Sequence, residues 1–120
     1  MANEITIAAR VQCVNGNVIE RDDDSSYTVN QASQSAATPG FVTIGTTEES
    51  ETFSELATLG WCKLKNIDAT NYVQVGFSAG VYGIRVEAGE SCVFRLEPGV
   101  TMYLKANTAA CKMLIRCYND

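Results

Sequence analysis

Apolar and polar residues alternate through most of the second half of the chain, from Leu59 to Tyr118. A period of two places every second side chain on the same face of a β-strand, so this pattern predicts a sheet with one buried side. Short turn segments separate the alternating runs, as at Asp68–Asn71, Ala88–Glu90 and Pro98–Gly99. Such spacing is typical of an all-β sandwich or barrel. The side chains expected on the buried face are Cys62, Leu64, Val73, Val75, Phe77, Ile84, Val86, Cys92, Phe94, Leu96, Met102, Leu104, Cys111, Met113, Ile115 and Cys117.

The first half of the chain carries a weaker form of the same pattern. Residues Glu4 to Val14 predict a strand, Asn15-Gly16 predicts a two-residue hairpin turn, and Asn17 to Arg21 predict a return strand. The inner face of the first strand is expected to carry Ile5, Ile7, Ala9, Val11 and Cys13.

Polar and small residues follow the predicted hairpin. Asp22 to Ser26 are expected to form a solvated turn, within a flexible polar segment around residues 22–40 that is suited to order against a neighbour. Phe41 to Thr47 predict another strand, and Glu51 to Leu56 a further strand or an extended connection. Asp68–Asn71 is expected to be a compact turn whose Asp and Asn side chains bond the local backbone.

The predicted strands do not alternate with helices, which excludes a parallel α/β sheet. We therefore predict one domain over residues 1–120, folded as an antiparallel, two-sheet, jelly-roll-like β-sandwich. An up-and-down barrel is the alternative, and strand order does not follow from the sequence.

Charge and hydropathy narrow the choice of partners. The chain has nine Lys and Arg against 14 Asp and Glu, a net charge of −5, and its basic residues are scattered along the sequence. This argues against a nucleic-acid-binding protein, which normally clusters Lys and Arg. No apolar run approaches the roughly 20 residues that span a bilayer. Met1 to Cys13 lacks the continuous apolar core of a signal peptide, so we expect a protein that stays in the cytoplasm unless a partner carries it elsewhere.

The residue inventory argues against an enzyme. The chain has no histidine, which excludes Ser-His and Cys-His catalysis. Its neighbouring carboxylates, Glu48 with Glu49 and the triplet Asp22–Asp24, do not flank a cleft from separate strands as those of glycosidases do. The triplet also lacks the spacing of a calcium loop. We expect no metal, no cofactor, and five cysteines that serve mainly as small apolar side chains.

Four aromatic residues fall on predicted strands out of phase with the apolar set. An aromatic row on the outside of a sandwich is typical of a protein–protein interface, where Tyr and Trp are enriched, or of a surface that stacks on sugar rings. We favour the interface. The candidate interface residues are Trp61, Tyr72, Tyr82 and Tyr103.

Several short motifs carry a family resemblance. They are IGTTEE from Ile44, LGW from Leu59, KNIDATNYVQVG from Lys65, AGE from Ala88, FRL from Phe94 and YLKANTAA from Tyr103. Over residues 42–118 this series resembles small virion structural proteins of tailed bacteriophages. The resemblance implies a β-sandwich subunit of a phage particle, made in the host cytoplasm and acting by self-association or by docking on the shell or tail.

The resemblance favours a capsid decoration, or head auxiliary, subunit. Such a protein is expected to form a symmetric homo-oligomer, for example a trimer, and to contact other virion proteins such as the major capsid protein. A neck, tail or fibre component is one alternative. A glycan-binding module for host attachment is another, and a hydrolase would need two carboxylates facing each other across a cleft.

Overall fold

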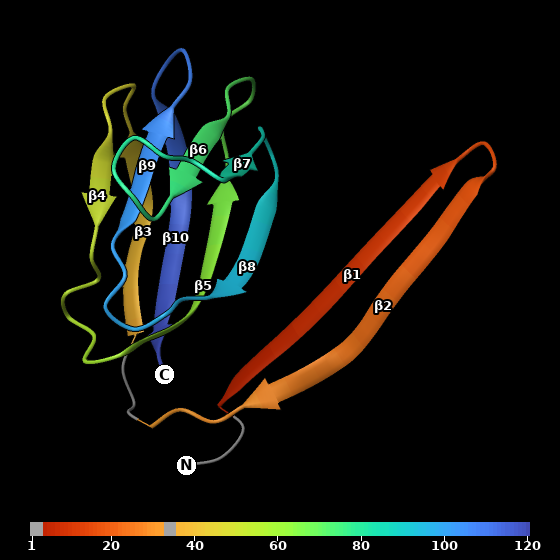
Figure 1. Cartoon of the computed structure of the whole chain (residues 1–120), viewed down its shortest axis with the longest axis horizontal. Coiled ribbons are helices and arrows are strands. Elements are labelled where there is room, and N and C mark those ends of the chain that lie inside the picture. The colour runs from red at the N-terminus through yellow and green to blue at the C-terminus, as the bar shows by residue number, and fades with distance from the viewer. Residues whose placement is uncertain (1–3, 33–35) are drawn as a thin grey trace. The chain divides into compact units, whose positions relative to one another are not determined.

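The computed structural model describes residues 4–32 and 36–120 and divides the chain into two compact units, Met1–Ser33 and Gln34–Asp120. All regular secondary structure in the described residues is β-strand. The sandwich is therefore built by the second unit alone, whereas the sequence predicted one sandwich over residues 1–120. Figure 1 shows the strands of both units.

The first unit is a two-stranded antiparallel hairpin of β1 (Ile5–Asn15) and β2 (Val18–Val29). Its turn consists of Gly16 and Asn17, because Asn15 pairs with Val18. Gly16 has a φ of 57°, the left-handed region that the first position of such a turn needs. The predicted hairpin is thus present, with its turn shifted by one residue.

Two predictions for the hairpin are wrong. Residues 22–26, expected to be a solvated turn, belong to β2, where Asp22 pairs with Val11 and Asp24 with Ala9. The expected inner face is also missing, since only Ile5 is buried and Val11 is 72% exposed. A strand buries one face only when a second layer covers it, and the hairpin is a sheet of its own.

The second unit contains two four-stranded antiparallel sheets that face each other (Figure 1). The first sheet, which we call the β10 sheet, has the order β3-β10-β5-β8, and the second, the β9 sheet, has the order β4-β9-β6-β7. The strands are β3 (Ala36–Ile44), β4 (Glu49–Glu51), β5 (Leu59–Asn66), β6 (Val73–Gly76), β7 (Ile84–Val86), β8 (Ser91–Arg95), β9 (Met102–Ala106) and β10 (Cys111–Asn119). The predicted all-β, antiparallel, two-sheet sandwich is confirmed.

Strand pairing in the sandwich is nested. The first strand, β3, pairs with the last, β10, and β4 pairs with β9. In the same way β5 pairs with β8, and β6 pairs with β7. Two further ladders, β10 with β5 and β9 with β6, join these pairs into the two sheets. Residues distant in sequence are therefore neighbours in every ladder except that of β6 with β7.

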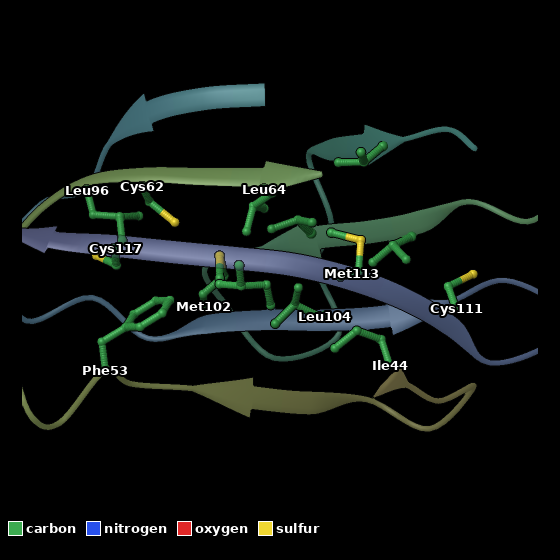
Figure 2. Packing of buried hydrophobic residues seen from close by; sticks show 14 of the residues in the cluster. Ile44, Phe53, Cys62, Leu64, Leu96, Met102, Leu104, Cys111, Met113 and Cys117 are labelled. Carbon is green, nitrogen blue, oxygen red and sulfur yellow. The ribbon is translucent and has the colours of Figure 1, made fainter. Parts of the chain in front are cut away.

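The core lies between the two sheets (Figure 2). Leu64 and Met113 come from the β10 sheet, Met102 and Leu104 come from the β9 sheet, and each is at most 1% exposed. The alternating pattern predicted most of this core correctly. Phe77 is the exception at 40% exposure, and Ile84, Cys92 and Phe94 are half-buried at its margin.

Cysteines are buried or half-buried in the sandwich but exposed in the hairpin. Cys62, Cys111 and Cys117 are buried free thiols, whereas Cys13 on the hairpin is exposed. Cys62 pairs with Cys117 across neighbouring strands. The hydrogen bond with Cys117 and burial both raise the pKa of the Cys62 thiol, which keeps it protonated and apolar.

One of two expected loop features differs from the structure. The segment 22–40 is mostly strand, because β2 reaches Val29 and β3 begins at Ala36, while its residues 33–35 lie outside the described residues. The stretch from Glu51 to Leu56, expected to be a further strand or an extended connection, forms a connection after a short β4.

Polar side chains hold the turns at one end of the sandwich. Asp68 Oδ2 accepts hydrogen bonds from the backbone N–H groups of Thr70 and Asn71, at 3.0 and 2.7 Å, as the sequence predicted. These bonds, that from Asn71 first, lower the pKa of the Asp68 carboxyl group. Asn66, fully buried at the end of β5, donates to the carbonyl oxygens of Asn71 and Val86 at 2.8 and 3.0 Å. The network fixes the loop that enters β6.

Candidate interaction surfaces

The four predicted aromatic residues do not form one row. Trp61 lies on β5 between the buried Gly60 and Cys62, so it faces outward from the β10 sheet. Tyr103 lies on β9 between the buried Met102 and Leu104, so it faces outward from the β9 sheet. Because these are opposite sides of the sandwich, the two residues do not share one face of a sheet.

The other two aromatic residues make contacts within the sandwich. The Arg85 guanidinium lies 4.2 Å from the centre of the Tyr72 ring. The Tyr82 hydroxyl donates a hydrogen bond to Glu48 Oε2, which also accepts from the Gly80 N–H at 2.7 Å. This contact raises the pKa of Tyr82 to about 12 and lowers the pKa of the Glu48 carboxyl group. All four aromatic residues are partly exposed, but each has a separate environment.

The structure instead gathers basic residues on the outer face of the β10 sheet, which we call the basic face. Lys63 and Lys65 lie on β5, where they alternate with buried residues. Lys112 and Arg116 do the same on β10, and Arg116 pairs directly with Lys63. Arg95 extends the group on β8, where it pairs with Trp61. Five of the nine basic residues of the chain thus lie on one face.

Little negative charge offsets the basic face. The four strands of the β10 sheet contain no Asp or Glu. Arg95 forms an ion pair with Asp120 at 3.2 Å. Among the described residues, none of Lys63, Lys65, Lys112 and Arg116 forms a salt bridge. In a chain of net charge −5, this face is a local region of positive potential.

The basic face is also hollowed and partly apolar. Lys63, Lys65, Leu114 and Arg116 line a hollow of about 80 Å³. Leu114 lies between the cations because it pairs with Lys65 on β5 and with Phe41 on β3. Phe41 is 68% exposed, so an apolar strip runs beside the positive charges. Such a mixture is suited to another polypeptide surface that carries both carboxylates and apolar side chains.

The hairpin offers a second surface, with two faces of different charge. Its carboxylate face carries Glu20, Asp22 and Asp24, which pair with Cys13, Val11 and Ala9 on β1. The opposite face carries Asp23, which forms ion pairs with Arg10 at 3.9 Å and Arg21 at 3.3 Å. Among the described residues, no salt bridge involves the three carboxylates of the carboxylate face.

Apolar side chains are exposed on both faces of the hairpin. Val11 and Val18 lie on the carboxylate face, and Val14 and Ile19 lie opposite. Their exposed fractions are 72, 51, 64 and 72%, respectively. A two-stranded hairpin without a covering layer is marginally stable in water. Its apolar surface is therefore suited to burial by another polypeptide.

No family model, curated protein or solved structure matches the chain. Within residues 4–32 and 36–120, no helix has the length and apolar character required to cross a membrane.

Sequence reasoning missed both surfaces. Lys63 and Lys65 were visible as neighbours on a strand, but Arg95, Lys112 and Arg116 join them only through the strand order of the β10 sheet. On the hairpin, the alternating apolar residues predict an inner face that the structure lacks. The acidic run beside them was the signal against a buried inner face.

Proposed function

We propose that the chain is a non-enzymatic structural protein of a bacteriophage virion, acting as a capsid decoration (cement) subunit. In this role it associates with further copies of itself and docks on the shell formed by the major capsid protein. The family resemblance over residues 42–118 supports the virion assignment, and the antiparallel sandwich is the fold that the resemblance implies.

The observation that carries the proposal is the exposed hairpin. A decoration protein needs a surface that another subunit can cover, and β1 and β2 carry exposed apolar side chains suited to this. Val11 and Ile19 are each 72% exposed on opposite faces of the hairpin. Burying apolar area contributes about 25 cal/mol per Å², so covering both faces would favour assembly.

The nested strand pairing supports the same assignment. We infer that the sandwich is a jelly roll, because pairing of first with last and second with second-last is what rolling up one long hairpin produces. Jelly rolls are frequent in viral capsid proteins. A neck, tail or fibre subunit remains the alternative within the same class, since it would also use self-association.

A glycan-binding module has less support. Such a site needs a continuous platform of exposed aromatic rings. Trp61 and Tyr103 face outward from different sheets, and Tyr82 is hydrogen-bonded to Glu48.

The mass of the full chain in solution, measured by light scattering after size exclusion with reducing agent, tests the proposal. We expect a discrete oligomer, such as a trimer, pentamer or hexamer. The double variant Val11→Ser/Ile19→Ser should lower the mass, whereas Val81→Ser, at a 63% exposed position of the sandwich, should not. A wild-type chain that stays monomeric and does not bind purified phage shells would contradict the proposal.

A further inference from the structure

We propose that the basic face of one copy binds the carboxylate face of the hairpin of a second copy. This inference rests on the proposed self-association and names the contact that produces it. Lys63, Lys65, Lys112 and Arg116 supply the positive charges, and Glu20, Asp22 and Asp24 supply the negative ones.

Complementary charge is the reason to expect the carboxylate face of a second copy on the basic face. The basic face is the largest gathering of cations in the described structure, and its four strands contain no carboxylate. The carboxylate face gathers three acidic side chains without an ion pair, while Arg10 and Arg21 engage Asp23 on the opposite face. Opposed charge arrays of this kind raise association rates and fix the orientation of the partners.

The spacing of the two charge arrays also matches. Glu20, Asp22 and Asp24 alternate along β2, and Lys63 and Lys65 alternate along β5. Both arrays therefore repeat at about 6.6 Å, twice the rise of a strand residue. If β2 of one copy lies along β5 of another, successive carboxylates can therefore lie beside successive ammonium groups.

Apolar side chains accompany the charges on both surfaces. On the hairpin, Val11 and Val18 lie among the carboxylates. On the basic face, Leu114 forms part of the hollow between Lys63, Lys65 and Arg116, with Phe41 beside it. An interface of this composition combines apolar burial with a charged rim, whereas a nucleic acid would offer phosphates without aliphatic side chains.

A charge-exchange experiment tests the contact. The variant Lys63→Glu/Arg116→Glu reverses the basic face, and Asp22→Lys/Asp24→Lys reverses the carboxylate face. All four positions are exposed, so the fold should tolerate the changes. We expect each variant alone to associate at least tenfold more weakly than wild type in sedimentation velocity. In an equimolar mixture the two variants should bind each other with an affinity within threefold of the wild-type contact, because each face of one variant then meets the opposite charge on the other.

The matched control is Arg85→Glu/Lys105→Glu, which changes the net charge equally on the outer side of the β9 sheet. It should associate like wild type. Equal weakening by the control and by Lys63→Glu/Arg116→Glu would overturn the proposed contact and assign the effect to net charge. Failure of the two variants to bind each other would also overturn it.

A labelled DNA duplex provides the remaining comparison. Tight binding of DNA by wild type, lost in Lys63→Glu/Arg116→Glu, together with unchanged self-association of that variant, would overturn the proposal in favour of a nucleic-acid surface. If wild type oligomerises and neither charge reversal affects it, only the contact fails and the proposed function stands. If wild type is monomeric at every concentration, there is no self-association, and both the proposed function and the proposed contact fail.

Discussion

The substitution Asn66→Asp tests how the loop before β6 is held. Asn66 is fully buried, and its Nδ2 donates to the carbonyl oxygens of Asn71 and Val86 at 2.8 and 3.0 Å. Its Oδ1 accepts from the Asp68 N–H at 2.9 Å. Aspartate has the same shape and keeps this acceptor, but it replaces the donor with an oxygen. The change therefore isolates the two donated hydrogen bonds from packing.

The expected loss of stability depends on pH. Below about pH 4 the carboxyl group is protonated and can donate one bond, so one carbonyl loses its partner at a cost of about 1–3 kcal/mol. Burial beside carbonyl oxygens raises the pKa of the introduced carboxyl group in the folded state. The unfolded chain ionises freely, so stability falls as the pH rises from about 4 towards the folded-state pKa. Each pH unit in this range adds about 1.4 kcal/mol to the loss, so the loss at neutral pH exceeds the loss at about pH 4.

Urea unfolding followed by Trp61 fluorescence measures the loss of stability relative to wild type. At about pH 4 it gives the cost of the missing hydrogen bond, and at neutral pH it adds the cost of the buried charge. The control is Asn107→Asp. Asn107 acts through its Oδ1, which accepts from the Tyr72 N–H at 3.0 Å, and aspartate keeps that bond. We expect the control to cost less than about 1 kcal/mol at both pH values. An Asn66→Asp loss that is equal at the two pH values would show that no buried charge forms at this position.

Two further predictions concern the β9 sheet. Gly76→Ala should destabilise the sandwich by several kcal/mol in thermal or urea unfolding, because its Cβ would lie 1.8 Å from a main-chain oxygen of the connection to β7. Gly83→Ala, which meets nothing within 4 Å, should be nearly neutral, and equal effects would contradict the packing described here. Tyr82→Phe should raise the pKa of the Glu48 carboxyl group towards its ordinary value, as followed by NMR titration of the side-chain carboxyl, because the hydroxyl donor is its main stabilising contact. An unchanged Glu48 pKa would show that the backbone N–H of Gly80 is sufficient.

The sandwich could be predicted from the sequence because its strands obey the simplest rule of a two-layer fold. Along β10, for example, Cys111, Met113, Ile115 and Cys117 alternate with more exposed residues, and each is buried. The rule depends on a covering layer, which the sequence does not show. The same alternation from Ile5 to Cys13 therefore predicted an inner face for the hairpin, where Val11 and Cys13 are exposed.

The candidate surfaces could be predicted only in part. A charged surface depends on which strands are neighbours, and a period of two does not determine strand order. Lys63 and Arg116 pair directly although 53 positions separate them, because β5 and β10 are adjacent in the sheet. The aromatic prediction met the same limit, since Trp61 and Tyr103 are similar in pattern but belong to different sheets. The outward orientation of these side chains could be predicted from the sequence, but the sheet to which each belongs could not.

Hydrogen exchange of the full chain, measured by mass spectrometry at low and high protein concentration, tests most directly whether other copies cover the hairpin. We expect peptides from residues 5–29 to exchange rapidly in dilute solution and much more slowly at high concentration. Peptides from the buried strand β9 should exchange slowly and equally in both. Rapid exchange of residues 5–29 at every concentration would contradict the claim that self-association covers this hairpin.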